Sequence, residues 1–448
     1  MSDSRRLMVH ALLALLFGVA ALRLTGFVSW FGRESLQLDF SAFYAAGEAH
    51  RLGVSPYLTH ADPPAPIWDG ADAYRHSRFL YPPLVAAFFE PLIHLGYAAA
   101  KRIWMLLSLA SVAGALWACG DALRLRWNAA TVLGLGIWVC LFHPLLALLE
   151  RGQIDAVTLL LIVLALRLLV RDERGGLGSG LLLAMATLLK LNVVFFVPFL
   201  VWRRRWRVLA GYLFGGAILI AATIAIEGTS ALETYLTREL PRISRHGEGG
   251  GDEMRLPKEA IQALRAGAPE GWTYRERHLY RIEALPMVAN ASLARVLSKR
   301  LGEDATPALI ALAILAATVL LLGLARRRQH GPPPAPIDEM VYWQAVMVSV
   351  LLAGPLTWAM NTVWLLPTGL VVLAGWREIR GPLMAGALVL VVLGLFLATI
   401  PDHHAFPLLS PLGSRVLNLK YVVAELLVFG GLLGLLAGRR AASTRAPG

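Results

Sequence analysis

Long apolar runs alternate with shorter polar segments along almost the whole chain. Each run approaches the roughly 20 residues that an α-helix needs to cross a bilayer. The pattern therefore predicts an all-α polytopic membrane protein whose residues 1–448 form one integral membrane domain. About twelve spans are expected, near residues 7–24, 80–97, 103–120, 130–149, 154–170, 177–201, 208–226, 305–325, 340–354, 362–375, 382–400 and 416–437.

The polar segments between the runs predict the topology. An even number of spans places both ends of the chain on one side, together with the arginine clusters Arg203–Arg205 and Arg439–Arg440. Positively charged loops stay in the cytoplasm, so this side is predicted to be cytoplasmic. The external side then carries a first loop at 25–79, a long loop at 227–303 and a loop with His403 and His404, while 304–448 hold the C-terminal transmembrane helices.

Composition excludes an ordinary soluble domain. Hydrophobic residues make up 57% and charged residues 16% of the chain, and the mean hydropathy is +0.59. The formal net charge of +12 comes from arginines gathered at the ends of apolar runs, which indicates membrane orientation and no nucleic-acid partner. Cys119 and Cys140 lie inside apolar runs, so we expect small core residues without a disulfide.

The first external loop holds the most distinctive stretch of the sequence. It reads Leu-Asp-Phe-Ser-Ala-Phe-Tyr-Ala-Ala-Gly at Leu38–Gly47, Gly-Val-Ser-Pro-Tyr at Gly53–Tyr57 and Phe-Leu-Tyr-Pro-Pro-Leu at Phe79–Leu84. The aromatic spacing predicts a helix that lies on the membrane and begins at Asp39. A carboxylate in this position, with tyrosine hydroxyls nearby, can take a proton from a hydroxyl group. The alternative is that Asp39 only caps the helix.

These strings, taken together, resemble glycosyltransferase family 87, which includes polyprenyl-phosphate-mannose-dependent mannosyltransferases. The resemblance implies a type C glycosyltransferase fold, an external active site in the cytoplasmic (inner) membrane and a sugar donor linked to a lipid phosphate. It also implies an acidic residue of the first external loop as the base, which is Asp39 in this sequence.

Lys190 is a second candidate, because an unpaired ammonium inside the apolar run 177–201 would cost several kcal/mol or lose its proton. Its expected partner is Asp155, Glu150 or a bound phosphate. The string Gly152-Gln-Ile-Asp155 resembles the family's Gly-Gln-x-Asn, and Lys190-Leu-Asn resembles its lysine motif. A structural Lys–Asp pair and a phosphate site both remain open.

The long loop 227–303 is predicted to form two surface helices on a glycine-rich hinge. They would act either as a flap over a lipid substrate, with arginines that meet its phosphate, or as a solvated loop. Asn290-Ala-Ser-Leu resembles a family string and equally fits a helix cap or a glycosylation acceptor.

The sequence departs from the family after Pro355-Leu-Thr-Trp358. One or two histidines usually follow this string, whereas Ala359, Met360 and Asn361 follow it here. Asn361 can keep a hydrogen bond but cannot carry a proton. His403 and His404, expected on the same side, are the alternative imidazoles.

The resulting hypothesis is an inverting transfer of a mannose-like hexose or a pentose from polyprenyl phosphate to a lipid or envelope-glycan acceptor. Asp39 would be the base, and neither a cofactor nor a metal is indicated, because no glycine-rich nucleotide loop or metal-ligand spacing is present. The alternatives are a transporter or flippase, for which we find no internal repeat, and a catalytically altered lipid-binding homologue. The candidate substrate-binding and lipid-phosphate-binding residues are Tyr44, Tyr57, Tyr81, Gln153, Asp155, Lys190, Arg238, Arg242, Asn290, Ser292 and Asn361.

Overall fold

The computed structural model describes residues 3–33, 38–57, 79–171, 175–241, 292–301, 307–326, 335–354, 357–379, 381–401 and 412–443. These residues form helices and connecting turns, and no strand occurs among them, which confirms the all-α prediction. The N-terminal helices are α1 (Asp3–Arg33), α2 (Leu38–Arg51), α3 (Leu84–Ile93), α4 (Tyr97–Ala122), α5 (Ala129–Leu141), α6 (His143–Arg151), α7 (Asp155–Arg171) and α8 (Gly176–Leu189).

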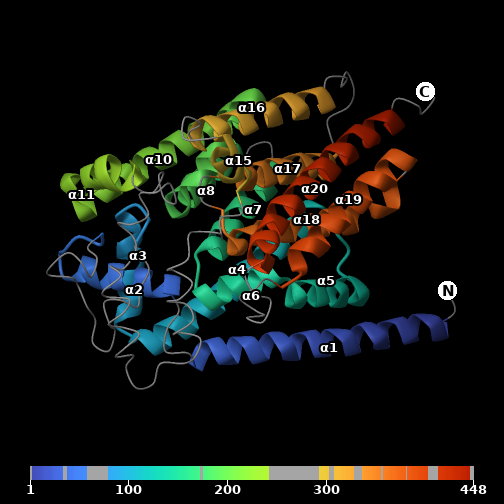
Figure 1. Cartoon of the computed structure of the whole chain (residues 1–448), viewed down its shortest axis with the longest axis horizontal. Helices are drawn as coiled ribbons and strands as arrows, with labels where there is room; N and C mark the ends of the chain where they lie inside the picture. The colour runs from blue at the N-terminus through green and yellow to red at the C-terminus, as the bar shows by residue number, and fades with distance from the viewer. Residues whose placement is uncertain are drawn as a thin grey trace.

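The remaining described helices complete a bundle whose long members run roughly along one axis (Figure 1). They are η3 (Leu191–Phe196), α9 (Val197–Trp202), α10 (Trp206–Glu227), α11 (Thr229–Thr234), η4 (Tyr235–Glu239), α15 (Leu293–Leu301), α16 (Pro307–Arg326), α17 (Pro336–Ala353), η6 (Ala359–Leu365), α18 (Leu366–Gly375), η7 (Trp376–Glu378), α19 (Pro382–Thr399) and α20 (Leu412–Ser443).

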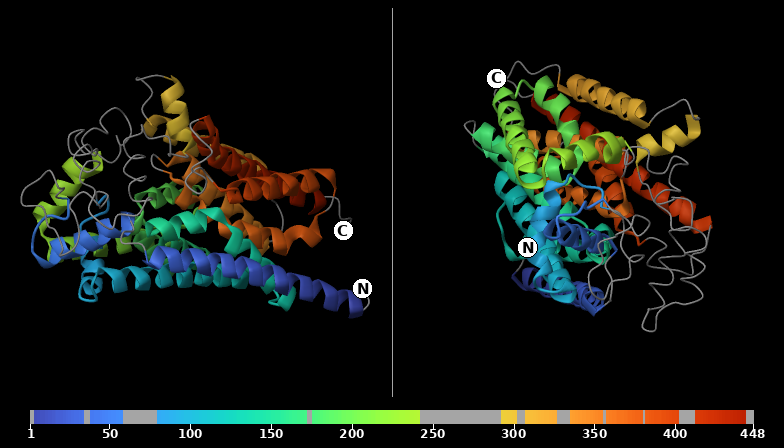
Figure 2. Two further views of the ribbon diagram at one scale, coloured as in Figure 1. Left: turned by 60° about the horizontal axis from the view of Figure 1, so that its bottom comes forward. Right: turned by 90° about the vertical axis from the view of Figure 1, so that its left-hand side faces the viewer.

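The two ends of the bundle differ. The start of α1 and the end of α20 lie at one end, which we call the terminal end (Figures 1 and 2). Helices α2, α3 and α11 lie at the opposite end. The start of α1 and the end of α20 thus lie together, and the placement of both chain ends in the cytoplasm stays a prediction.

Six described helices are long and apolar enough to cross a membrane, which confirms a polytopic membrane protein. The pair α5–α6, bent by 56°, is a candidate seventh span. The total of about twelve spans stays a prediction. The six are Ser4–Arg33, Tyr97–Ala122, Trp206–Glu227, Ala308–Ala325, Pro382–Thr399 and Leu419–Arg439.

The predicted span at 80–97 is wrong. This segment contains α3, which has only 10 residues and is therefore about 15 Å long at 1.5 Å per residue. The chain then turns at Gly96, whose φ of 72° lies in the left-handed region, before α4 begins at Tyr97. An apolar run alone did not show this turn, because hydrophobicity does not report the backbone conformation of Gly96.

Two further apolar runs are interrupted helices. The run 130–149 breaks at Phe142, whose backbone is extended, where α5 ends and α6 begins with His143-Pro144. The run 177–201 breaks at Lys190, which is also extended and separates α8 from η3. Interrupted backbone at membrane depth is tolerated where protein or a polar cavity surrounds it. The interruptions therefore mark where polar groups can gather inside the bundle.

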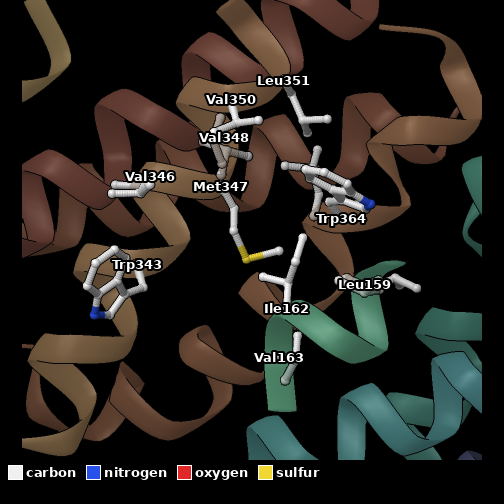
Figure 3. Close-up of a cluster of buried hydrophobic side chains, with 14 of the residues drawn as sticks. Leu159, Ile162, Val163, Trp343, Val346, Met347, Val348, Val350, Leu351 and Trp364 are labelled. Carbon is white, nitrogen blue, oxygen red and sulfur yellow. The ribbon is translucent and has the colours of Figure 1, made fainter. Parts of the chain in front are cut away.

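The largest apolar core joins α7, α17 and η6 (Figure 3). Met347 of α17 packs among Ile162, Val163 and Trp364, all with at most 1% of their surface exposed. Lipid tails are as apolar as these side chains, so close packing, more than removal from water, holds such a core together.

An ion-pair cluster ties helices together at the terminal end. Arg203 and Arg205, between α9 and α10, both pair with Glu339 in the first turn of α17. Arg203 also lies over the ring of Tyr342, 4.6 Å from its centroid. Here the charges join the connection between α9 and α10 to the start of α17.

Candidate functional site

Asp39 lies in the first turn of α2 and is 7% exposed. The predicted helix is present, and its aromatic face packs against α3 and α4. Phe43 stacks on Phe89 at 4.6 Å, and Phe40 lies 6.3 Å from Trp104. Because Phe89 of α3 and Trp104 of α4 pack on this face, α2 is fixed against the rest of the protein.

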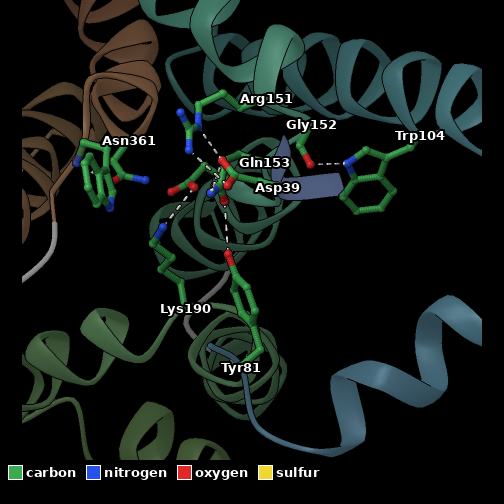
Figure 4. Close-up of polar contacts among 10 residues, drawn as sticks. Asp39, Tyr81, Trp104, Arg151, Gly152, Gln153, Lys190 and Asn361 are labelled. Atoms are coloured by element: carbon green, nitrogen blue, oxygen red, sulfur yellow. Dashed lines mark hydrogen bonds and ion pairs between the residues drawn. The ribbon is translucent and has the colours of Figure 1, made fainter. Parts of the chain in front are cut away.

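A bidentate ion pair holds the Asp39 carboxylate. Arg151 donates from Nε to Oδ2 at 2.6 Å and from Nη2 to Oδ1 at 3.2 Å, and Gln153 Nε2 donates to Oδ2 at 2.8 Å (Figure 4). Forked guanidinium–carboxylate pairs are both strong and geometrically specific. Asp39 therefore joins α2 to the turn between α6 and α7.

The turn owes its shape to Gly152. Arg151 ends α6, and Gly152 follows at φ 73° and ψ 37°, a left-handed conformation that glycine adopts without steric cost. Trp104 Nε1 donates to the Gly152 carbonyl at 2.8 Å and fixes the turn from the side of α4. Asp155 then begins α7. Arg151, Gln153 and Asp155 are thus alternate residues of one short connection.

Gln153 also connects Asp39 to Tyr81 and, through Tyr81, to Tyr57. The Tyr81 hydroxyl donates to Gln153 Oε1 at 3.0 Å, and the Tyr57 hydroxyl donates to the Tyr81 carbonyl at 2.8 Å. Burial, with the charges of Asp155 and Asp39 adding to it, raises the pKa of the Tyr81 phenol well above its ordinary value. Burial likewise raises the pKa of Tyr57. Both phenols therefore stay protonated and act as donors.

Lys190 pairs with Asp155, one of the three partners expected for it. Lys190 Nζ lies 3.0 Å from Asp155 Oδ2, with the Asp155 side chain fully buried and the Lys190 side chain 14% exposed. The pair links the start of α7 to the break after α8. The Asp39–Arg151 pair and the Lys190–Asp155 pair therefore extend from the two sides of the same turn.

Three buried polar atoms near these helix interruptions lack a hydrogen-bond partner within the described ranges. They are Asp155 Oδ1, Asn192 Oδ1 and Asn361 Nδ2. Asn361 Oδ1 accepts from the Trp358 backbone N–H at 2.6 Å, while its amide nitrogen points toward Arg151 and Lys190 (Figure 4). Unsatisfied buried polar atoms are costly, so a polar ligand group at this place would be stabilised.

Other predicted site residues have structural roles or lie elsewhere. The Tyr44 hydroxyl donates to the Ile93 carbonyl at 3.1 Å and holds α2 on α3. Ser292 caps α15, because its hydroxyl accepts from Arg295 N at 3.3 Å. Arg238 is exposed, and no hydrogen bond or ion pair within the described part of the chain joins it to Asp39, Arg151 or Gln153. Arg242, Asn290, His403 and His404 lie outside the described residues.

Sequence reasoning did not single out Arg151 or Trp104. The available signal was the position of Arg151 directly before the Gly152-Gln-Ile-Asp155 string, but an arginine at the end of an apolar run first indicates membrane orientation. For a metal, no group of three or more His, Cys, Asp or Glu side chains suited to bind one occurs in the described ranges.

Comparison with known proteins gives a consistent result. The sequence model of glycosyltransferase family 87 matches residues 79–354, a range that includes Tyr81, Arg151, Gln153 and Lys190 but begins after Asp39. No solved structure matches the chain, so the type C fold rests on the family resemblance.

Two curated relatives come from Mycobacterium tuberculosis. A polyprenol-phosphate-mannose-dependent alpha-(1-2)-phosphatidylinositol pentamannoside mannosyltransferase is 26% identical over 361 residues, 79% of this chain and 72% of the relative. A polyprenol-phosphate-mannose-dependent alpha-(1-2)-phosphatidylinositol mannoside mannosyltransferase is 24% identical over 399 residues, 83% of this chain and 78% of the relative.

Proposed function

Because the chain belongs to glycosyltransferase family 87, we propose that this membrane glycosyltransferase takes its sugar from a polyprenyl phosphate. The sugar is a mannose-like hexose or a pentose, and the acceptor is a hydroxyl group of a lipid or of an envelope glycan. Two relatives whose names state dependence on polyprenol-phosphate mannose support the donor class. The site geometry supports the chemistry.

The observation that carries the proposal is the Asp39 carboxylate, held by Arg151 and Gln153 close to the Lys190 break. In the reaction, the acceptor oxygen forms a bond to the anomeric carbon while the bond from that carbon to the phosphate oxygen breaks. Asp39 takes the proton of the acceptor hydroxyl, and polyprenyl phosphate leaves with the bonding electrons. A single displacement of this kind inverts the configuration at the anomeric carbon.

The leaving group sets what else the site must provide. A phosphate leaves as an anion, so catalysis needs cations more than it needs a general acid. An ammonium has three N–H donors, and Lys190 uses one of them on Asp155. Lys190 therefore can hold the phosphate without giving up its pair, and the amide nitrogen of Asn361 is a second donor on the same side. We propose that no further cofactor is required.

The active site is proposed to face the outside of the cytoplasmic membrane. Helix α2, whose first turn carries Asp39, lies at the end of the bundle opposite to the chain ends (Figure 1). Arg203 and Arg205 pair with Glu339 in the first turn of α17, where Asp338 also pairs with Arg439 near the end of α20. Ser55→Cys, at an exposed position after α2, should react with a membrane-impermeant maleimide in intact cells, whereas Arg207→Cys should react only after lysis. The native Cys119 and Cys140 are buried and serve as the unreactive background. The reverse pattern would overturn the external site.

The activity itself can be tested with purified protein in nanodiscs. The substrates are polyprenyl-phosphate mannose with radiolabelled mannose, a matching pentose donor, and a membrane-lipid extract of the source cells as acceptor. We expect labelled sugar in a new lipid or glycan product and an equal amount of released polyprenyl phosphate. Movement of intact donor across proteoliposomes without such release would favour a flippase and contradict the proposal.

A further inference from the structure

Tyr235 is a buried tyrosine that the mechanism above does not use. It opens η4, a five-residue π-helix that directly follows α11, and its backbone carbonyl accepts from the Leu240 N–H. Wide π-turns are rare and occur often at functional sites, because the extra residue re-aims a side chain. Tyr235 is 3% exposed and is part of the aromatic cluster that also contains Phe40, Phe43 and Tyr57.

A continuous series of contacts leads from Tyr235 to the Asp39 carboxylate. The ring of Tyr235 stacks on Tyr57 with centroids 6.0 Å apart and an interplanar angle of 23°. The Tyr57 hydroxyl donates to the Tyr81 carbonyl at 2.8 Å, and the Tyr81 hydroxyl donates to Gln153 at 3.0 Å. After burial, Tyr235 is among the groups that raise the pKa of both the Tyr57 and the Tyr81 phenols.

The Tyr235 hydroxyl has no hydrogen-bond partner anywhere in the described ranges, although it is buried. A buried tyrosine hydroxyl normally finds a partner, and leaving one unmade costs about 1–3 kcal/mol. The cost is offset if a ligand supplies the partner. A phenol is both a donor and an acceptor, which matches the hydroxyl group of a sugar. A phosphate is better bound by a cation, such as the ammonium of Lys190.

We propose that the Tyr235 hydroxyl binds a hydroxyl group of the sugar held beside Asp39, and that it thereby selects among sugars. In this proposal the Tyr57 and Tyr235 rings line the sugar subsite, whereas Lys190 and Asn361 bind the phosphate. This inference rests on the proposed function. The sugar hydroxyl belongs either to the donor or to a sugar-bearing acceptor, and the experiment distinguishes the two.

The test compares Tyr235→Phe with the native enzyme in transfer from polyprenyl-phosphate mannose to a phosphatidylinositol mannoside. The variant keeps the ring and its stacking but loses the hydroxyl, so kcat/KM should fall about tenfold, the size of one uncharged hydrogen bond. Donors and acceptors that each lack one sugar hydroxyl are then assayed with both enzymes. A site built to bind a hydroxyl discriminates strongly against the analogue that lacks it.

The native enzyme should penalise one of these deoxy substrates, and Tyr235→Phe should no longer do so. A lost penalty on a deoxy donor assigns the contact to the donor, and on a deoxy acceptor to the acceptor. The matched control is Tyr212→Phe, which removes a hydroxyl 3.1 Å from Thr187 Oγ1 in α8 and should change no substrate preference. Thermal stability is measured for both variants.

Two results would count against the inference, and they are separable from failure of the proposed function. An active native enzyme with unchanged kcat/KM in Tyr235→Phe would overturn the role of Tyr235 alone. An equal loss for every deoxy substrate, with lower thermal stability, would show a purely structural tyrosine. Absence of transfer by the native enzyme from either the mannose or the pentose donor would instead overturn the proposed function, and the inference with it.

Discussion

Two buried carboxylates in this protein are each held by arginine, yet their surroundings differ. Glu339 is paired with Arg203 and Arg205 where helix ends meet at the terminal end. Asp39 is paired with Arg151 where α6 ends, and an amide, two tyrosines and a second ion pair adjoin it. The comparison teaches that an arginine–carboxylate pair alone does not indicate function. What sets the Asp39 pair apart is the Gln153 amide, the Tyr81 hydroxyl and the Lys190–Asp155 pair beside it.

The largest expected difference between the two carboxylates is in turnover. The amide introduced by Asp39→Asn would still accept hydrogen bonds but could not take a proton, so transfer should fall by about 10²–10⁴-fold. Glu339→Gln makes the same chemical change at the terminal end and should leave the rate within about twofold, since no reacting group lies there. Both variants are assayed in nanodiscs with thermal stability in parallel. Native-like turnover by Asp39→Asn would remove this residue from the mechanism.

Removing the arginine partners should affect stability at both ends but activity at only one. Breaking a buried pair costs about 3–5 kcal/mol, and the 30% exposure of the Arg151 side chain reduces the expected cost to about 1–3 kcal/mol. Arg203→Met should be comparably or more destabilised, because that side chain is only 9% exposed. Thermal unfolding in detergent measures both. If Arg203→Met lost transfer as severely as Arg151→Met at equal folded fraction, the two ends would not differ in function.

The second ion pair of the site can be separated into structural and binding roles. Lys190→Met should weaken donor binding about tenfold, the size of one charge-assisted hydrogen bond, and it should lower stability by leaving Asp155 unpaired. Adding Asp155→Leu removes the lone charge, so stability should recover while donor affinity stays low. Equilibrium binding of polyprenyl-phosphate mannose and thermal unfolding are the two measurements. Recovery of both in the double variant would make the pair purely structural.

The smallest effect is expected at Ser292, which resembles a family motif but caps α15. Ser292→Ala should lower the free energy of unfolding by about 1 kcal/mol, as lost N-caps do, and should leave donor affinity unchanged. Ser292→Thr retains the hydroxyl and is the control. A loss of donor binding in Ser292→Ala without loss of stability would move this residue into the site.

Local patterns in the sequence predicted part of this arrangement. The spacing of Phe40, Phe43 and Tyr44 predicted a helix beginning at Asp39, and the structure confirms the helix. The cost of a lone ammonium in an apolar run predicted a partner for Lys190, and Asp155 is that partner. The first prediction used the spacing of neighbouring residues, and the second used the general cost of a lone charge in an apolar run. Both can be read from the sequence without knowledge of the fold.

The pairing of Asp39 with Arg151 could not be predicted in the same way. The two residues are 112 positions apart, and the interruption of the 130–149 run and the left-handed Gly152 bring them together. The prediction of a span at 80–97 was wrong for a related reason, because hydrophobicity does not show where a helix ends. The sequence model of the family also begins after Asp39, so only the structure connects this carboxylate to the matched region.

The short connection after α6 also limits how the chain can change over evolution. Its alternate residues Arg151, Gln153 and Asp155 serve two different partners, Asp39 and Lys190. Inserting or deleting one residue here would shift the residues that follow relative to Arg151, and one of the two partners would lose its contact. Substitutions do not change the length of this connection, so they do not shift these residues relative to one another. We therefore expect natural sequences that keep both ion pairs to differ freely in loop length elsewhere, but to align without gaps from Arg151 to Asp155.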